Sequence, residues 1–391
     1  MEINKQSKTA IPGIYDLLPD KGYHNGFEVL NMGGSEKDST RTAFFTYGNP
    51  SARPLWRLAQ WETRYDFRDA TKTTFSAPRT GVYSYDSGDK VFTVDTAEET
   101  LRMELRASRV YTGPRCLGQG WPHLLIEGAT TNANAPFASL LSHARHLRLS
   151  FSQRLCNFRD HMGDGADPTL HAGSFYIYLY IKGIKPNGET EMTWFGLTLF
   201  DNRFDFDEEK GSRDGGKADA SGLFIYQIPI CAFRDQPVTM GQWIPVDIDV
   251  LPFVKRALIL AQQRGYMQGI TMDTLFIDGM NMGWEMPGTY DGCMEIRGLR
   301  LRSYVKTTYT APYGVGNYLI GEMPPVGILP LDEKRQLRIW KPGNHDEDVL
   351  TVRCDPVNCD DCKIQMWING RPAPHVTQTA VTEAANQEEN G

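Results

Sequence analysis

The chain has 391 residues, of which 40% are hydrophobic and 11% aromatic, and its formal net charge is −7. This acidic balance excludes generic nucleic-acid binding, which needs a basic surface. The N-terminal residues lack the apolar segment of a signal peptide, and no apolar run reaches membrane-spanning length. We therefore expect a cytoplasmic protein without a membrane partner, or a secreted one if a leader has been removed.

Residues 1–54 carry turn formers and little periodicity, which predicts an extended N-terminal arm on the main body. From residue 55 to residue 306, short strand-like segments with turn signals between them predict an all-β protein, a jelly-roll β-sandwich. The expected strands are Trp56–Phe67, Gly81–Tyr85, Lys90–Asp95, Leu101–Ser108, His123–Glu127, His146–Leu155, Ser174–Lys182, Thr193–Phe200, Leu223–Pro229, Gln242–Ile248, Thr274–Asp278 and Met294–Tyr304.

One helix is predicted among these strands. Asp249 is a capping residue, Pro252 lies in the first turn, and the apolar residues of the segment that ends at Gly265 recur at helical spacing. A single helix amid strands is expected to cover one edge of a sheet.

The C-terminal part is predicted to form a linker over 307–330, a small antiparallel β unit over 331–376 and a disordered tail over 377–391. Most of the seven Cys residues are scattered, which favours reduced thiols over a disulfide framework. Cys354, Cys359 and Cys362 could form a zinc site with His345, but their spacing is irregular, so we expect a metal-free, reduced cluster.

The segment from Ser174 to Lys182 contains the most informative pattern. Its alternation places Tyr176, Tyr178 and Tyr180 on one face of a strand and apolar residues on the other. Tyrosines on a wet sheet surface suit flat contact with a sugar ring, and the alternative is a half-exposed strand of high β-propensity. We expect this face to look outward into a concavity.

Two further strands have polar faces. One carries His146 and Arg148, and the other carries Arg102, Glu104 and Arg106, while Trp194 lies on a face of a third strand. If these strands neighbour the tyrosine strand, one surface combines rings for stacking with cations for hydroxyls or carboxylates. The alternative is a solvated sheet face with cross-strand ion pairs.

The many short strands, the single helix and the aromatic polar face resemble concanavalin A-like jelly-roll proteins, which include lectins, glucanases and polysaccharide lyases. The Arg102-Met-Glu-Leu-Arg106 segment is similar to the R-x-E-L-R strand motif of alginate-lyase-type jelly rolls. That resemblance implies that Arg102, Glu104 and Arg106 line a substrate groove. The Gln-x-His motif of those lyases and the E-x-D-x-E motif of the glucanases have no counterpart here.

Two loops add candidate residues. Asp201 and Arg203 leave a strand end, and Asp205, Asp207 and Glu209 after them have the spacing of three calcium ligands, although Lys210 replaces the usual Gly. No cofactor is expected, with a structural calcium ion here as the alternative.

The second loop is expected over 278–291. There Trp284 could stack on a ring and Glu285 could accept hydroxyl hydrogen bonds, or Trp284 could fill the end of the core.

Three functional hypotheses follow. The first is a protein that binds a glycan or oligosaccharide on a concave Tyr/His/Arg face. The second is an enzyme on the same face, a lyase of acidic polysaccharide or another carbohydrate-active enzyme, with Tyr178 or His146 as base and Arg148, Arg102 or Arg106 neutralising the uronate carboxylate. The third is an assembly subunit, which predicts a stable homo-oligomer without sugar.

Overall fold

The computed structural model describes residues 13–33, 41–130, 135–215 and 220–305, together with five short strands nearer the C-terminus. The chain divides into two compact units, Met1–Val305 and Lys306–Gly391. In the part of the chain that the structure describes, no helix is long and apolar enough to span a membrane.

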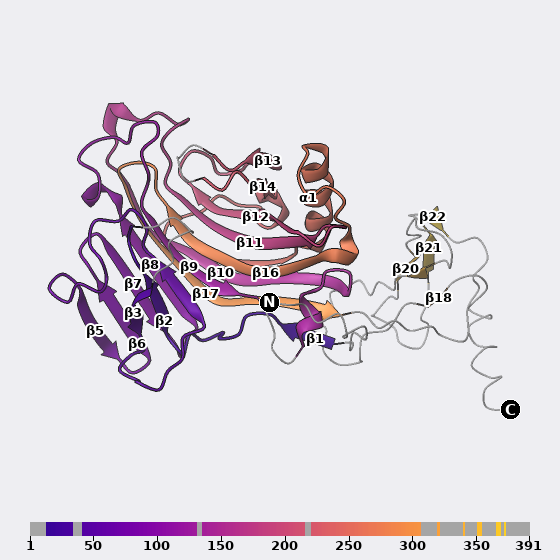
Figure 1. Ribbon diagram of the computed structural model, residues 1–391, viewed down its shortest axis with the longest axis horizontal. Helices are drawn as coiled ribbons and strands as arrows, with labels where there is room; N and C mark the ends of the chain where they lie inside the picture. Colours follow the sequence, from indigo (N-terminus) through magenta and orange to yellow (C-terminus); the bar gives the residue numbers. More distant parts are fainter. Residues whose placement is uncertain are drawn as a thin grey trace. The chain divides into compact units, whose positions relative to one another are not determined.

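The first unit contains an eight-stranded sheet, formed by long strands near its centre and short ones toward one edge (Figure 1). Its strands are β1 (Gly13–Asp16), β5 (Thr74–Arg79), β6 (Val82–Asp86), β7 (Lys90–Asp95), β8 (Thr100–Arg106), β10 (Ala144–Asp160), β15 (Ile244–Asp249) and β17 (Tyr290–Val305). Their order is β15-β10-β17-β8-β7-β6-β5, with β1 also paired to β17, and every pair is antiparallel.

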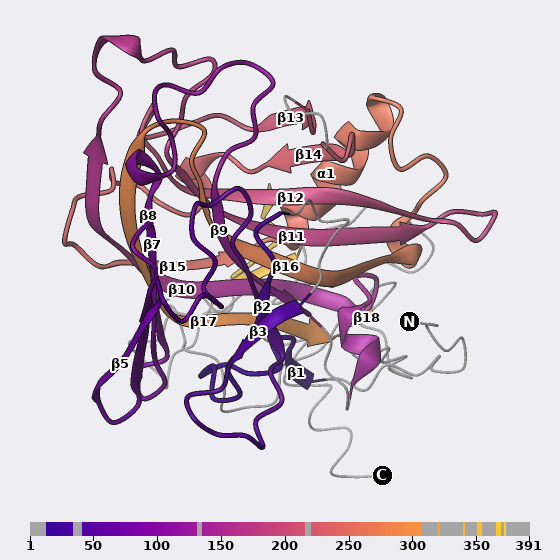
Figure 2. The same cartoon turned by 60° about the vertical axis from the view of Figure 1, so that its left-hand side comes forward.

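A nine-stranded sheet forms the second layer of this unit. Its strands are β2 (Phe27–Leu30), β3 (Arg41–Phe45), β4 (Trp56–Ala59), β9 (His123–Ala129), β11 (Ser174–Ile184), β12 (Thr190–Asp201), β13 (Lys210–Arg213), β14 (Phe224–Gln227) and β16 (Leu275–Glu285). Their order is β13-β14-β12-β11-β16-β9-β4-β2-β3. Figure 2 shows β12, β11 and β16 lying side by side in this sheet.

The core lies between the two sheets, where alternate residues of each strand are buried. Phe92, Met103 and Leu149 come from the eight-stranded sheet, and Ile177 and Leu197 from the nine-stranded one, and all five are fully buried. Each such side chain contributes roughly 1.5–3 kcal/mol through its removal from water. The fold is therefore the predicted all-β sandwich of jelly-roll type.

The predicted helix is also confirmed. Helix α1 (Leu251–Gln263) begins after Asp249, whose Oδ1 accepts a hydrogen bond from the backbone N–H of Leu251, and Gly265 follows the helix with a φ of +86°. The buried face of α1 belongs to the main core, and the helix contacts β10 of one sheet and β12, β13 and β14 of the other. It thus covers one open edge of the sandwich. The described 3-10 turns are η1 (Ala107–Arg109), η2 (Pro136–Ser139), η3 (Gly163–Gly165), η4 (Ile230–Ala232) and η5 (Met272–Thr274).

The structure differs from the sequence-based expectation in the first 54 residues. Instead of an extended arm, this region supplies β1 to the eight-stranded sheet and β2 and β3 to the nine-stranded one. The strands have only four or five residues, too few for an alternating pattern to stand out, and the partner of β1 is distant in sequence.

In the second unit, the described strands are β18 (Leu319–Ile320), β19 (Ile339–Trp340), β20 (Leu350–Arg353), β21 (Gln365–Ile368) and β22 (Arg371–Pro372). Strand β18 pairs with β19, and β20, β21 and β22 form a three-stranded antiparallel sheet. The expected linker at 307–330, the tail at 377–391 and the cluster of Cys354, Cys359 and Cys362 lie wholly or largely outside the described residues.

Candidate functional site

The three tyrosines of β11 lie on the outer face of the nine-stranded sheet, away from the core. Their neighbours along the strand, Phe175, Ile177, Leu179 and Ile181, are buried between the sheets, whereas the tyrosines are half-buried. The alternation predicted from the sequence is therefore present.

The tyrosine rings lie over glycines of the two neighbouring strands. Tyr178 pairs with Gly196 of β12, and a Cβ atom added to Gly196 would lie 2.6 Å from the Tyr178 ring. A Cβ atom added to Gly279 of β16 would lie 2.8 Å from the ring of Tyr180. Because real Cβ atoms do not approach so closely, these two glycines allow the rings to lie along the sheet instead of standing away from it. The result is an aromatic surface in which the centroids of Tyr176 and Tyr178 are 5.4 Å apart and the two rings are inclined by 40°.

Hydrogen bonds fix the outer ends of these rings. The Tyr178 hydroxyl accepts a hydrogen bond from Gln227 Nε2 at 3.1 Å, and the Tyr176 hydroxyl donates to Asp201 Oδ2 at 3.3 Å. Trp194 lies edge-on to Tyr180 with a centroid separation of 4.9 Å, and its exposed fraction is 8%. The rings are thus held in place before any ligand arrives, which lowers the entropy cost of binding.

Burial raises the pKa of Tyr176 and of Tyr178 above the ordinary tyrosine value, and the nearby carboxylates of Asp201 and Glu285 act in the same direction. Both phenols therefore stay protonated at neutral pH. This electrostatic setting suits a hydrogen-bonding and stacking role and opposes the role of Tyr178 as a proton-abstracting base.

One end of the tyrosine row is bounded by Asp201, which is enclosed by donors. Its two oxygens accept hydrogen bonds from Arg203 Nε at 2.8 Å and Nη2 at 2.7 Å, and Oδ2 also accepts one from the Ser174 hydroxyl at 2.7 Å. The Asp201 side chain has no exposed surface, and that of Arg203 is 30% exposed. This hydrogen-bonded ion pair raises the pKa of Arg203 and presents the edge of its guanidinium beside Tyr176.

Glu285 lies across Ser174 from Asp201. Ser174 pairs with Asp201 on one side and with Glu285 on the other, so two strand spacings, about 9–10 Å, separate the backbones of the two acidic residues. Glu285 Oε2 accepts a hydrogen bond from Trp121 Nε1 at 3.3 Å and lies 3.7 Å from His123 Nε2.

A cavity of about 270 Å³ opens at this end of the sheet. Trp121 forms one side, with the Arg115 guanidinium 4.7 Å from its ring centroid, and Tyr176, Arg203 and Glu285 form the floor and the far side. The remaining lining residues are Leu117, Thr169, Leu170, Ala172, Ser174 and Pro287. The cavity therefore combines two half-buried aromatic rings with two cations and one carboxylate.

The other predicted polar residues lie on the other sheet. Arg102, Glu104 and Arg106 belong to β8, and His146 and Arg148 belong to β10, whose partners are β15 and β17. The expectation of one surface that combines them with the tyrosines is wrong. Residues 161–173, which follow β10, carry the chain from the eight-stranded sheet to the nine-stranded one, so strands that are consecutive in sequence are not neighbours in space.

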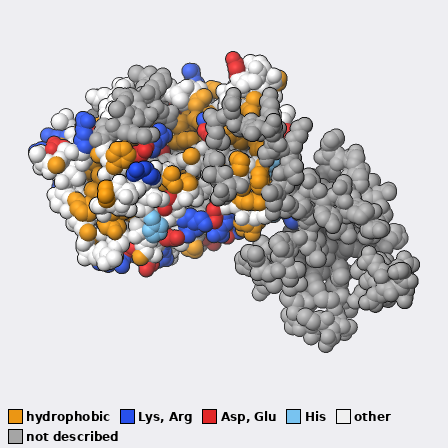
Figure 3. All heavy atoms as spheres, turned by 60° about the horizontal axis from the view of Figure 1, so that its bottom comes forward, with side chains coloured by type: hydrophobic (Ala, Val, Ile, Leu, Met, Phe, Trp, Pro, Cys, Tyr) orange, Lys and Arg blue, Asp and Glu red, His pale blue; other side chains and the backbone are white. Residues whose placement is uncertain are grey.

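These residues form ion pairs, within β8 for Arg106 and Glu104 and across to β15 for Arg148 and His146. Arg106 Nε donates to Glu104 Oε1 at 2.7 Å, and Arg148 Nη2 lies 2.7 Å from Asp247 Oδ2. His146 Nδ1 is 2.6 Å from Asp249 Oδ2. Figure 3 shows one face of the molecule on which basic and acidic side chains lie next to one another between hydrophobic ones. Because Tyr178 lies on a different sheet from Arg102, Arg106 and Arg148, the version of the lyase mechanism with Tyr178 as base is not assembled.

The expected loop over 278–291 is also corrected. Strand β16 continues to Glu285, and Trp284 is fully buried, with its Nε1 donating to the backbone oxygen of Met103 at 2.9 Å. Gly279, Asn281 and Gly283 lie within this strand, and their low β-propensity hid it. Trp284 is therefore a core residue, and Glu285 is the residue of this segment that reaches the cavity.

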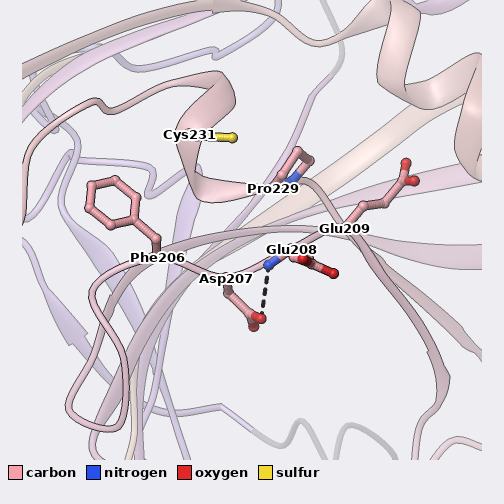
Figure 4. Close-up of a pocket in the computed structure, with 6 residues that line it drawn as sticks. All are labelled: Phe206, Asp207, Glu208, Glu209, Pro229 and Cys231. Atoms are coloured by element: carbon pink, nitrogen blue, oxygen red, sulfur yellow. Dashed lines mark hydrogen bonds between the residues drawn. The ribbon is translucent and has the colours of Figure 1, made fainter.

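The acidic segment after Asp201 lines a second cavity (Figure 4), bounded by Phe206, Asp207, Glu208, Glu209, Pro229 and Cys231. The carboxylates of Asp207 and Glu209 point in different directions in Figure 4, and they pair with Lys210 and Arg256, respectively. Among the described residues, no group of three or more His, Cys, Asp or Glu side chains could hold a metal ion.

Several residues of the site were not predicted. Arg115 comes from the segment before β9, and Gly196, Gly279 and Gln227 become significant only through the strand register. A glycine opposite an aromatic residue on a neighbouring strand is a detectable signal, but only after the strand pairing is known.

Comparisons with known proteins give structural neighbours only, since no family model and no curated protein matches the chain. A family 11 xylanase from Neocallimastix patriciarum is 8% identical, with 60% of this chain and 96% of that chain covered and a TM-score of 0.30. A cellulase derived from the Cel12A cellulase of Rhodothermus marinus is 10% identical, covering 63% and 98%, with a TM-score of 0.31. A family 11 carbohydrate-binding module from Clostridium thermocellum is 10% identical, covering 66% and 94%, with a TM-score of 0.22. These values are too low to transfer any residue role or activity.

Proposed function

We propose that this protein binds a carbohydrate on the outer face of the nine-stranded sheet, over Tyr176, Tyr178 and the cavity beside Trp121. The observation that supports the proposal is the row of aromatic rings that Gly196 and Gly279 make room for. Aromatic rings stack on the apolar faces of sugar rings, and Arg203 and Glu285 at the end of the row supply a donor and an acceptor for hydroxyl groups.

Binding without hydrolysis is the function that we favour for this face. Glycoside hydrolysis requires two carboxyl groups that both reach one bond, at separations of about 5–5.5 Å or about 6.5–9.5 Å. Asp201, the carboxylate across Ser174 from Glu285, has no exposed side-chain surface and is neutralised by Arg203. Among the described residues that line this cavity, Glu285 supplies the one carboxylate.

The test is titration of the full chain with neutral and acidic oligosaccharides, selected on a glycan array and measured by calorimetry. We expect Tyr178→Ala to weaken binding by about 1–3 kcal/mol, the scale of a lost aromatic contact and its buried area. Tyr304→Ala is the matched control, because Tyr304 is a half-buried tyrosine on the other sheet, where it contacts His146.

Arg148→Ala serves as a second control for the same reason, since Arg148 lies in β10. If the wild-type chain binds neither neutral nor acidic glycans, or if Tyr304→Ala weakens binding as much as Tyr178→Ala, the proposal is overturned.

A further inference from the structure

Two cysteines meet at a β-bulge in the eight-stranded sheet. The ladder between β10 and β17 pairs Leu155 with Met294 and then Asn157 with Cys293, so Cys156 is the extra residue of the bulge. A bulge places two residues of one strand opposite one residue of its partner. Cys156 and Asn157 therefore both lie opposite Cys293.

Both cysteine side chains are on the outer face of this sheet. Leu155 and Met294, the pair next to the bulge, are buried in the main core. Because side chains alternate along a strand, Cys156 and Cys293, which adjoin them, lie on the other side of the sheet. Cys293 pairs in turn with Glu104 of β8. The two thiols thus lie within the ion-pair network of this face, next to Glu295 and Arg102.

The backbone geometry already permits a covalent bond between the two. Neighbouring strands lie about 4.7–4.9 Å apart, and a disulfide requires a Cα separation of about 4.4–6.8 Å. Both residues are free thiols in this structure, and Cys156 Sγ lies 3.7 Å from the backbone oxygen of Arg154. No strand has to move to another register for the sulfur atoms to join.

The two thiols have different environments. Cys156 is half-buried and accessible from solvent, whereas Cys293 has no exposed surface. The hydrogen bond from Cys293 lowers the pKa of Cys156, with burial and Glu295 opposing it and Arg102 and Arg154 assisting it. The same hydrogen bond, together with burial, raises the pKa of Cys293. Cys156 is thus the thiol that ionises and reacts first.

We propose that Cys156 and Cys293 form a redox modification site, which a low-molecular-weight disulfide of the glutathione type converts into an internal disulfide. The Cys156 thiolate attacks one sulfur of the external disulfide, which forms a mixed disulfide and releases one thiolate. Cys293 then loses its proton to solvent and attacks the Cys156 sulfur, which releases the second thiol. Two protein thiols are oxidised, and one external disulfide is reduced to two thiols.

The expected result is a covalent link between the two central strands of the eight-stranded sheet. This site is independent of the proposed carbohydrate-binding face, because β10 and β17 belong to the other sheet. The second step should follow quickly on the first, since the bulge places the two cysteines opposite one another.

The test is incubation of the folded full chain with glutathione disulfide, followed by peptide mapping under non-reducing conditions. We expect a cross-linked peptide pair that contains Cys156 and Cys293, with the loss of two hydrogen atoms and of two titratable thiols. Cys116 and Cys231, which are exposed and serve as internal references, should carry only glutathione adducts.

Two variants separate the steps. In Cys293→Ser, the glutathione adduct on Cys156 should accumulate, because no resolving thiol remains, whereas Cys116→Ser should leave the internal link unchanged. If the wild-type map shows a persistent glutathione adduct on Cys156, or unmodified Cys156 beside modified Cys116, the proposal is overturned. The wild-type map alone decides this point even if Cys293→Ser does not fold.

Discussion

The outer face of the nine-stranded sheet carries tyrosines that lie over glycines, whereas the outer face of the eight-stranded sheet carries arginines paired with carboxylates. Tyr178 over Gly196 represents the first face, and Arg148 beside Asp247 represents the second. Both faces come from strands whose inner residues fill the same core. The comparison shows that alternation alone predicts which residues are outside but not which chemistry an outer face will have.

The two faces also differ in how deeply their charged side chains are buried. The Asp201 side chain is enclosed by Arg203, Ser174 and Tyr176, while the side chains of Arg148 and Asp247 are 41% and 57% exposed. Removing the partner of a buried charge lowers the free energy of unfolding strongly, whereas an exposed ion pair contributes little to it. The carboxylates of the two faces should therefore respond differently to removal.

The largest effect should come from Asp201→Ala. This change leaves Arg203 and the Ser174 hydroxyl without their shared acceptor, and we expect the free energy of unfolding to fall by about 3 kcal/mol, the upper end for hydrogen bonds to a charged group. Asp247→Ala, the matched change on the other face, should cost less than about 1 kcal/mol. Urea denaturation of both variants measures the difference, and equal losses would contradict the contrast between the two faces.

An intermediate effect is expected from Gly279→Ala. The new Cβ atom would lie 2.8 Å from the Tyr180 ring and 3.1 Å from the backbone oxygen of Gly128, so the ring must lift away from the sheet at a cost of about 1–3 kcal/mol. Gly113→Ala is the control, because nothing lies within 4 Å of a Cβ atom there. Denaturation and glycan titration should both register the first change and neither the second. An unperturbed Gly279→Ala variant would show that the rings do not depend on this glycine.

The smallest effects should appear in the pH dependence of the unfolding free energy, to which Tyr178 and Asp249 contribute with opposite signs. Burial raises the pKa of Tyr178 in the folded chain. The contribution of Tyr178 to the free energy of unfolding is therefore complete below about pH 10, the unfolded value, and is lost as the pH rises through the folded pKa. Tyr178→Phe should therefore reduce the alkaline slope of the unfolding free energy by up to about 1.4 kcal/mol per pH unit.

Asp249 on the other sheet has the opposite sign. Burial raises the pKa of Asp249. Hydrogen bonds from His146 and from the backbone N–H groups of Leu147 and Leu251 lower it by more, so the net pKa is below the ordinary value. The contribution of Asp249 to the free energy of unfolding is present above about pH 3.9, the unfolded value, and is lost as the pH falls through the folded pKa. Asp249→Asn should flatten the acid slope and leave the alkaline slope unchanged. Denaturation from acid to alkaline pH, with both variants side by side, checks the two signs.

Much of the fold could be predicted from the sequence because its signals are local. The period of two in β11 separates Tyr178 from Ile177 and Leu179, and the turn formers mark where strands end. Helix α1 was recognisable from Asp249, Pro252 and Gly265, because capping and backbone constraints act within a few residues. For the same reason the short strands before residue 54 and the glycine-containing continuation of β16 beyond Asp278 were not recognised.

What the amino-acid sequence by itself determined is therefore the set of strands, the helix and the two faces of each strand. Only the tertiary structure decided which strands are neighbours, and with them the partners of each face. Hydrogen-bond ladders join residues far apart in the chain, so β11 lies beside β16 and not beside β10, and Tyr176 is near Glu285 but on a different sheet from His146. Alternation is a property of one strand, whereas a binding surface is a property of several, and this is why candidate residues were predicted but not which of them lie together.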